Sequence, residues 1–231
     1  MKIEKVTVIG AGLMGSGIAA QVANAGLPVN LLDIVPDGAE NKNVISQSAI
    51  SRMLKPVKLG SPSQLMHPDN ADFITAGNLE DDLNLISDSD LIIEVVLEKL
   101  EIKHDVFRKI EKYRKKSSIV TSNTSTIPRA QLIEGMPSSF GQDFFITHFF
   151  NPPRYLRLLE VVASKEVDNR KLDAIIDFCD VRLGKEVVVC NDTPGFIGNR
   201  IGMFWSLTAM VEAFKAGLTV EEADAIMGRP I

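Results

Sequence analysis

A glycine-rich segment near the N-terminus has the spacing of a phosphate-binding loop. Residues 10–15 read Gly-Ala-Gly-Leu-Met-Gly, between an apolar run at 6–9 and an amphipathic run from residue 13. In the pattern G-x-G-x-x-G the first glycine permits a tight turn, the second lets the backbone approach a pyrophosphate, and the third lets helix pack on strand. The following helix offers unpaired N–H groups to the phosphates. The residues predicted to bind a dinucleotide are Gly10, Gly12, Leu13, Met14 and Gly15.

Asp33 narrows the choice of dinucleotide. It ends the second β-branched run, roughly 20 residues after the loop, where a carboxylate accepts hydrogen bonds from an adenosine ribose. Its charge would repel the 2′-phosphate of NADP, and residues 34–38, Ile-Val-Pro-Asp-Gly, contain no arginine to hold that phosphate. FAD uses the same loop, so the glycines alone do not name the cofactor. With Asp33 included, we expect NAD.

His148 and Glu160 could form an acid–base pair. Of the three histidines, His67 stands in a loop-like stretch and His104 on a solvated helix, which leaves His148 as the candidate base. A histidine among phenylalanines can also be a satisfied core residue. Glu160, however, lies in an apolar strand where an unpaired carboxylate is costly, and a carboxylate facing an imidazole stabilises imidazolium and fixes the tautomer. The pair suits removal of an alcohol proton while hydride leaves the carbon.

The elements that must position these residues alternate between β-branched runs and amphipathic helices. Such alternation predicts an α/β fold of the Rossmann type, a doubly wound and mostly parallel sheet. Ligands of such sheets bind beyond the carboxyl ends of the strands, where Glu98, Ser125 and His148 follow their strands. Strands are expected at 6–9, 29–34, 73–75, 91–96 and 119–122, and helices at 13–25, 43–54 and 101–113.

The C-terminal part changes character. Strands at 144–149, 156–162 and 186–190 and a helix at 169–182 are expected to extend the same sheet, and then helices follow at 196–216 and from Thr219, which has Glu222 in a capping box. We expect a dinucleotide-binding domain at 1–192 and the start of an all-α domain at 193–231. Two helices bury little surface alone. The chain is therefore expected to be truncated, and its exposed apolar residues at 196–231 to mediate self-association.

Composition sets broad limits on the partners. The chain has 231 residues, 45% hydrophobic and 24% charged, which is ordinary for a globular protein. A net charge of −5 gives no attraction to nucleic acid or anionic lipid, so neither is expected as a partner. Two cysteines provide neither a disulfide framework nor a zinc site, so no metal is expected. The N-terminal stretch lacks signal-peptide features, which predicts a cytoplasmic location, or an organelle matrix if a transit segment has been removed.

Several separated motifs together resemble the 3-hydroxyacyl-CoA dehydrogenase family. They are GAGLMGSGIA, EVVLEKLEIK, SNTST, HFFNPPRYLRLLE and DTPGFIGNR, in that family's order. The resemblance implies NAD-dependent oxidation of (3S)-3-hydroxyacyl-CoA to 3-oxoacyl-CoA in fatty acid β-oxidation, and a homodimer formed through the helical domain. ITAGNLEDD and NPPRYLRLLE are more similar to the branch in which the dehydrogenase is fused to an enoyl-CoA hydratase.

The resemblance also implies roles for individual residues. His148 would be the general base and Glu160 its orienting partner, and Ser125 and Asn199 would hydrogen-bond the 3-oxygen and thioester region of the substrate. The positions that match the NAD site near the nicotinamide and its ribose are Glu98, Lys103, Ser125 and Asn151. These residues could also have purely structural roles: Glu98 and Lys103 could form a surface ion pair, and Asn151 could shape the turn before Pro152.

The resemblance also implies contacts to coenzyme A from the segment after the second strand. The family uses a serine and a lysine after the second strand, and the nearest matches here are Ser48 or Ser51 and Lys55. Arg52 and Lys58 are further candidates for the CoA phosphates, although a helix with several basic residues is usually just solvated.

Two other functions remain open. A β-hydroxyacid or nucleotide-sugar dehydrogenase shares the glycine loop but generally relies on a lysine where this chain has Asn199. A noncatalytic NAD-binding relative of the lens-crystallin kind shares the fold, and the intact set of His148, Glu160, Ser125 and Asn199 argues against it.

Overall fold

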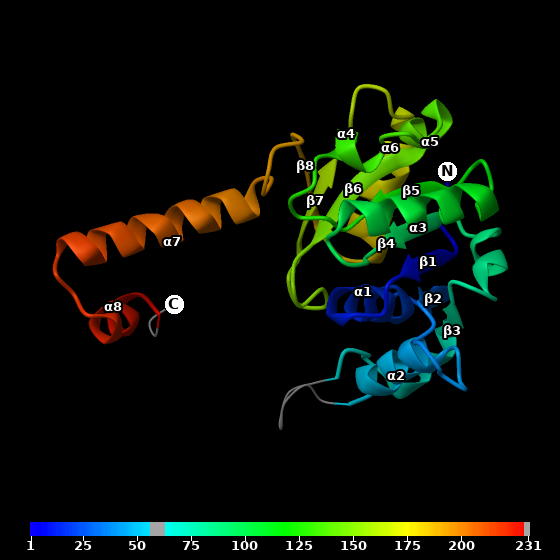
Figure 1. The fold of residues 1–231 in the computed structure, drawn as a ribbon, viewed down its shortest axis with the longest axis horizontal. Coiled ribbons are helices and arrows are strands. Elements are labelled where there is room, and N and C mark those ends of the chain that lie inside the picture. The colour runs from blue at the N-terminus through cyan, green and yellow to red at the C-terminus, as the bar shows by residue number, and fades with distance from the viewer. Residues whose placement is uncertain (56–62, 229–231) are drawn as a thin grey trace.

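The computed structural model describes residues 1–55 and 63–228 and shows an eight-stranded sheet with helices on both faces (Figure 1). The strand order is β3-β2-β1-β4-β5-β6-β7-β8, and every described neighbouring pair is parallel except β6 and β7. This confirms the doubly wound α/β fold. The strands are β1 Val6–Ile9, β2 Val29–Asp33, β3 Ile74–Asn78, β4 Leu91–Glu94, β5 Ile119–Ser122, β6 Phe144–Phe149, β7 Leu158–Val162 and β8 Glu186–Cys190.

The helices follow the predicted alternation with the strands. They are α1 Leu13–Asn24, α2 Val44–Met53, α3 Leu100–Tyr113, α4 Arg129–Leu132, α5 Ser138–Asp143, α6 Asn169–Asp177, α7 Gly198–Lys215 and α8 Val220–Met227, with shorter helical segments η1 Pro68–Phe73, η2 Leu83–Ile86 and η3 Phe178–Arg182. The expected helix at 169–182 is thus α6 continued by η3. The predicted capping box of α8 is present, because Thr219 and Glu222 each accept the other's backbone N–H.

Some predicted boundaries were wrong for local reasons. β3 begins at residue 74 and continues to 78, since Gly77 and Asn78, poor strand formers, pair with Leu32 and Asp33 of β2. β4 stops at Glu94, whose carboxylate accepts the N–H of Val96 at 2.7 Å. β2 ends one residue early, β7 begins at 158 rather than 156, and α7 begins at 198 rather than 196.

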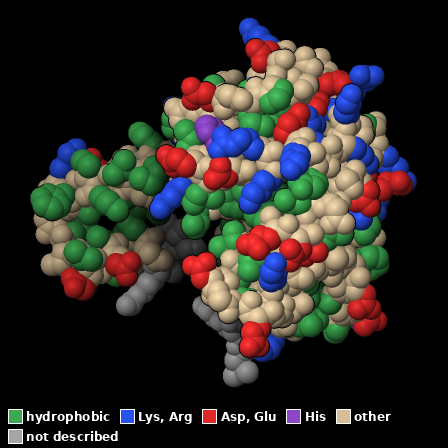
Figure 2. Space-filling model, turned by 45° about the vertical axis from the view of Figure 1, so that its right-hand side comes forward, with side chains coloured by type: hydrophobic (Ala, Val, Ile, Leu, Met, Phe, Trp, Pro, Cys, Tyr) green, Lys and Arg blue, Asp and Glu red, His purple; other side chains and the backbone are tan. Residues whose placement is uncertain are grey.

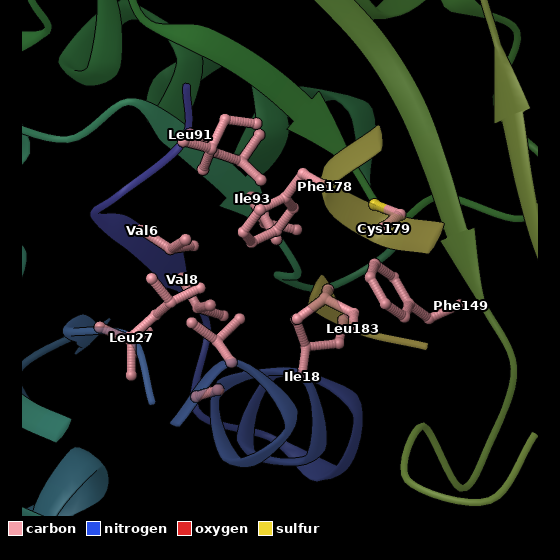
Figure 3. Packing of buried hydrophobic residues seen from close by; sticks show 14 of the residues in the cluster. Val6, Val8, Ile18, Leu27, Leu91, Ile93, Phe149, Phe178, Cys179 and Leu183 are labelled. Atoms are coloured by element: carbon pink, nitrogen blue, oxygen red, sulfur yellow. The ribbon is translucent and has the colours of Figure 1, made fainter. Parts of the chain in front are cut away.

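Buried side chains fill both faces of the sheet. On one face, residues of β1, β4 and β6 meet those of α1 and η3, as Figure 3 shows for Val8, Ile93, Phe149, Ile18 and Phe178. A second cluster covers the other face, with α3 packed against the sheet. Alternate residues of β1 and β4 therefore enter different clusters, which explains why apolar residues stand at consecutive positions in these strands.

The helices α7 and α8 extend away from the sheet (Figure 1). Across these two helices, which the structure describes in full, no side chain is buried. Figure 2 shows hydrophobic side chains gathered over this projecting part. None of the described helices is long and apolar enough to cross a membrane. The proposed domain boundary after residue 192 falls between β8 and α7 and stays a prediction.

Candidate active site

The glycine loop joins β1 to α1 and leaves room for an anion. A Cβ on Gly10, where φ is +108°, would lie 2.4 Å from the carbonyl oxygen of Val95, and one on Gly15 would lie 1.7 Å from that of Gly10. Neither position can carry a side chain. A Cβ on Gly12 meets no described atom within 4 Å, and no side chain of the described residues caps α1 there. The open space at this helix N-terminus fits a pyrophosphate.

Asp33 lies beside this loop, at the carboxyl end of β2. Its Oδ2 accepts the N–H of Ala11 at 2.5 Å and its Oδ1 accepts the N–H of Ile34 at 2.7 Å. The carboxylate is therefore next to the loop, as the sequence predicted, and its contact with a ribose stays a prediction. The sequence did not reveal that Asp33 also holds the glycine loop in place.

One cavity brings together most of the residues predicted to line the NAD site. It has a volume of about 330 Å³ and opens between the glycine loop and the ends of β4 and β5. Its predicted members are Gly12, Leu13, Met14, Glu98, Lys103 and Ser125, and it also includes Asn123. Since these residues come from four separate segments, their convergence supports a shared ligand rather than separate local roles.

Lys103 connects this cavity to a buried carboxylate that sequence reasoning missed. Its side chain, 1% exposed, places Nζ 2.8 and 3.0 Å from the two oxygens of Glu94 and 3.1 Å from Oε2 of Glu98. A surface ion pair is thus the wrong interpretation of Lys103. Burial raises the pKa of Glu94, and the ammonium of Lys103 and the Ser122 hydroxyl, 2.6 Å away, oppose that shift. A carboxylate within an apolar strand, the signal that identified Glu160, also marks Glu94.

Glu98 organises the loop after β5. Its Oε1 accepts hydrogen bonds from the hydroxyl of Thr124, from the hydroxyl of Thr126 at 3.1 Å and from the N–H of Ser125 at 3.3 Å. Partial burial alone would raise the pKa of Glu98, but the Thr124 hydrogen bond and the ion pair with Lys103 outweigh burial and lower it. Glu98 is therefore ionised at neutral pH and can accept a hydrogen bond from a hydroxyl group inside the cavity.

His148 and Glu160 face each other across the antiparallel pair β6–β7. They are directly opposite in the register, and Nδ1 of His148 lies 2.8 Å from Oε2 of Glu160. Both are buried, with 6% and 0% of their surface exposed. Beside a carboxylate, which only accepts hydrogen bonds, a neutral imidazole carries its proton on Nδ1 and keeps the lone pair on Nε2. The predicted pair is present, and its geometry leaves Nε2 able to act as a base.

The second oxygen of Glu160 binds backbone. Its Oε1 accepts the N–H groups of Ile197 and Gly198 at 2.9 and 2.7 Å, at the start of α7. The rings of Phe150 and Phe196 lie 4.6 and 5.5 Å from the imidazole, between ring centres. Glu160 is fully partnered, as a buried charge requires.

The remaining predicted residues are more scattered. Asn199 lines a separate cavity of about 510 Å³ together with Thr126, the residue after Ser125. Asn151 is exposed, and its turn rests on α1, since Pro153 lies 3.0 Å from where a Cβ on Gly17 would be.

The residues predicted to contact coenzyme A lie on or just after α2. Ser48 is half-buried, Ser51 donates its hydroxyl to the carbonyl of Gln47 at 3.0 Å, and Arg52 and Lys55 are exposed. None of these side chains, all within the described ranges, lines either cavity above. Lys58 lies outside the described residues.

Known proteins share this architecture and these motifs. A family model described as "3-hydroxyacyl-CoA dehydrogenase, NAD binding domain" matches residues 5–193. A Deinococcus radiodurans protein named "Probable 3-hydroxyacyl-CoA dehydrogenase" is 46% identical over 228 residues, which are 99% of this chain and 65% of that protein. A Rickettsia felis protein whose name describes a fatty acid oxidation complex trifunctional enzyme is 49% identical over 203 residues, 88% of this chain and 28% of that protein.

A solved structure agrees over the whole chain. The crystal structure of Mycobacterium tuberculosis FadB2 has a TM-score of 0.81 at 29% identity and covers 100% of this chain and 79% of its own. The chain spans only about two thirds of the Deinococcus protein and less than a third of the Rickettsia protein. The chain belongs to the 3-hydroxyacyl-CoA dehydrogenase family, and residues 5–193 form its NAD-binding domain.

Proposed function

We propose that this chain is part of an enzyme that oxidises (3S)-3-hydroxyacyl-CoA to 3-oxoacyl-CoA with NAD, in fatty acid β-oxidation. The observation that carries the proposal is the buried His148–Glu160 pair, with its 2.8 Å contact, in a chain that also has an open cradle at Gly12. The names of the two relatives support the substrate class and the pathway. The intact pair favours catalysis over a purely structural NAD-binding role.

The pair supplies the proton chemistry of this oxidation. Nε2 of His148 takes the proton of the C3 hydroxyl while the C3–H bond breaks and the C3 oxygen becomes a ketone. NAD, when bound, accepts the hydride that leaves C3. Positive charge then develops on the imidazole, and the carboxylate of Glu160, held at its other oxygen by two N–H groups, stabilises it.

Binding roles follow from the two cavities. Glu98 and Lys103, which line the first cavity, are assigned to the ribose near the nicotinamide. Asn151 is assigned to the same region on the basis of family resemblance alone. Ser125 and Asn199, which line neighbouring cavities, hold the 3-oxygen and thioester region of the substrate. Contacts to coenzyme A are assigned to Ser48 or Ser51 and Lys55 on the basis of family resemblance alone.

The proposal includes partners beyond the substrate. The name of the Rickettsia felis relative, a trifunctional enzyme, supports fusion of this dehydrogenase to further domains. That one of them is an enoyl-CoA hydratase is proposed from the resemblance of ITAGNLEDD and NPPRYLRLLE alone. The exposed apolar residues of α7 and α8 support a homodimer that forms through the helical segment.

Replacement of the base tests the proposed function. In the full-length protein, His148→Gln is expected to lower kcat roughly 10² to 10⁴ fold in the reduction of acetoacetyl-CoA by NADH, with little change in the Kd for NAD. Glu160→Gln should slow the same step and, when the reaction is followed in the direction of alcohol oxidation, move the acidic limb of the pH profile to lower pH, because imidazolium loses its partner. His67→Gln, at an exposed loop histidine, is the control. An unchanged rate in His148→Gln would assign the base to another residue.

A further inference from the structure

Phe196 has a backbone conformation that is unusual for its residue type. Its φ is +46°, and in the described ranges 1–55 and 63–228 it is the only residue other than glycine with a positive φ. Bulky residues rarely adopt this left-handed region, and such residues persist only where the surrounding structure fixes them. Phe196 is 3% exposed, so its side chain is held by packing. Because Phe196 lies next to His148, the candidate base, its unusual backbone conformation points to a role at the site.

The turn at Phe196 aims two consecutive N–H groups at one oxygen. Ile197, with φ −102° and ψ −56°, returns to the right-handed region, and successive residues of opposite hand form a concave group of N–H donors that binds anions. The anion here is the carboxylate of Glu160, whose Oε1 lies 2.9 Å from the nitrogen of Ile197 and 2.7 Å from that of Gly198. Without the turn, the chain could not present both donors to this oxygen.

Packing around Gly198 leaves this arrangement little freedom. A Cβ on Gly198 would lie 2.7 Å from the ring of Phe150 and 3.5 Å from Oε1 of Glu160. The rings of Phe150 and Phe196 also contact the imidazole of His148. The segment that begins α7 is therefore fitted against both members of the acid–base pair.

We propose that Phe196 is a positioning residue whose left-handed backbone fixes the Glu160 carboxylate and, through it, the tautomer and orientation of His148. The two oxygens of Glu160 have different tasks: Oε1 is fixed by the turn and Oε2 by Nδ1 of His148. Glu160 thereby ties the first turn of α7 to the base, so that a displacement of this helix start would disturb proton transfer. This inference rests on the proposed role of His148 as the base.

A matched pair of substitutions separates the backbone of Phe196 from its ring. Phe196→Gly and Phe196→Ala leave nearly the same space beside His148, but only glycine adopts a positive φ without steric cost. The imidazole ¹⁵N chemical shifts of His148 report which nitrogen carries the proton. We expect wild type and Phe196→Gly to show the Nδ1–H tautomer and Phe196→Ala a mixture of both tautomers. In the full-length protein, kcat of Phe196→Ala should be about tenfold lower than that of Phe196→Gly, with equal Kd for NAD.

Other outcomes decide between the two proposals. Equal tautomer populations and equal kcat in the two folded variants would overturn the role of the backbone, and a loss relative to wild type that both variants share would assign the effect to the ring. If Phe196→Ala unfolds, the pair Phe196→Asn and Phe196→Leu replaces the first pair. Asparagine tolerates the left-handed region, as glycine does, and leucine does not. If the tautomers respond as expected while His148→Gln keeps full activity, the positioning is correct and the proposed function is wrong.

Discussion

Two carboxylates, Glu94 and Glu160, stand within apolar strands, and each fixes a basic side chain at the candidate site. Both are fully buried. Glu94 accepts from Lys103 with both oxygens and from the N–H of Val96, whereas Glu160 contacts His148 with one oxygen and the start of α7 with the other. A buried charge is tolerated when its lone pairs are satisfied, so each carboxylate depends on an exact set of donors.

Removal of Glu94 should destabilise the protein strongly. In Glu94→Ala the ammonium of Lys103 stays buried with Glu98 as its remaining carboxylate, and an uncompensated buried charge costs about 3 to 5 kcal/mol. Urea unfolding followed by circular dichroism would measure the loss. Glu101→Ala, at an exposed position of the same helix α3, is the control and should change the free energy of unfolding by less than about 0.5 kcal/mol. A small loss in Glu94→Ala would mean that Glu98 alone compensates Lys103.

Asp33 should determine the preference for NAD over NADP. Because its Oδ2 also accepts the N–H of Ala11 in the glycine loop, Asp33→Ser would remove both the negative charge and this hydrogen bond. Asp33→Asn keeps an acceptor for the Ala11 N–H and removes only the charge that repels a 2′-phosphate. Calorimetry on both variants should show a smaller ratio of the Kd for NADP to the Kd for NAD, with weaker NAD binding in Asp33→Ser than in Asp33→Asn. An unchanged ratio in both variants would show that Asp33 does not contact the ribose.

The residue types predicted part of this site and missed the rest for a physical reason. Glu160 was recognisable because a carboxylate in an apolar strand needs a partner and His148 was available nearby. Glu94 shows the same signal, but its partner Lys103 lies on a helix whose surface pattern looks solvated. That Lys103 is buried depends on how the first turn of α3 packs over the end of β4, and spacing within the sequence does not reveal this.

At the scale of elements, the acid–base pair depends on the direction of β7, which runs antiparallel to β6. The sequence predicts β6 and β7 as strands of one sheet, and neither their antiparallel pairing nor the register that sets His148 opposite Glu160 is visible in their composition. A shift of one residue would move Glu160 to the other face. The parallel arrangement of β1 to β5 was predictable from the sequence. Helices connect these strands, and a helical crossover brings the chain back to begin the next strand in the same direction as the last.

Asp90 should link the stability of three elements to pH. Its carboxylate accepts N–H groups of Glu4 and Lys5, before β1, at 2.9 and 3.1 Å, and the ammonium of Lys115, after α3, at 2.7 Å. Burial alone would raise the pKa of Asp90, but these hydrogen bonds outweigh burial and lower it. The stabilisation is therefore fully present above the unfolded pKa of about 3.9 and is lost as pH falls through the lower folded pKa.

The expected consequence is a pH-dependent cost of Asp90→Asn. At neutral pH the variant should lose about 1 to 2 kcal/mol in the free energy of unfolding, since it loses charge-assisted hydrogen bonds. At acid pH, below the lowered folded pKa, wild type protonates Asp90 as well, and the difference should shrink. Denaturant unfolding at both pH values provides the measurement, and Asp88→Asn, in an exposed pair with Lys5, should have almost no effect. If the difference in the free energy of unfolding between Asp90→Asn and wild type did not change with pH, the charge of the carboxylate would not be its cause.

At the scale of the whole molecule, the two C-terminal helices differ from the rest. Their apolar side chains have no buried face within the described residues, whereas every strand of the sheet except the edge strands β3 and β8 is almost entirely buried. Large exposed side chains include Phe204, Trp205, Met210 and Phe214. Contiguous apolar surface of this kind usually marks an association surface, and its proximity to Glu160 through Gly198 connects association to the candidate site.

We therefore expect this chain to self-associate through residues 196–231 while NAD binds to the domain at 5–193. Sedimentation at several concentrations should show a mass that rises with concentration, and the fluorescence of Trp205, which is 47% exposed in the single chain, should shift to shorter wavelength as its indole becomes buried. Phe214→Glu, at a side chain 90% exposed, should weaken association at least about tenfold, because a charge would enter an apolar contact. Val181→Glu, at an exposed valine of η3, is the control and should leave association unchanged. A strictly monomeric chain with the emission of a buried, dry indole would show instead that α7 and α8 fold back onto their own domain.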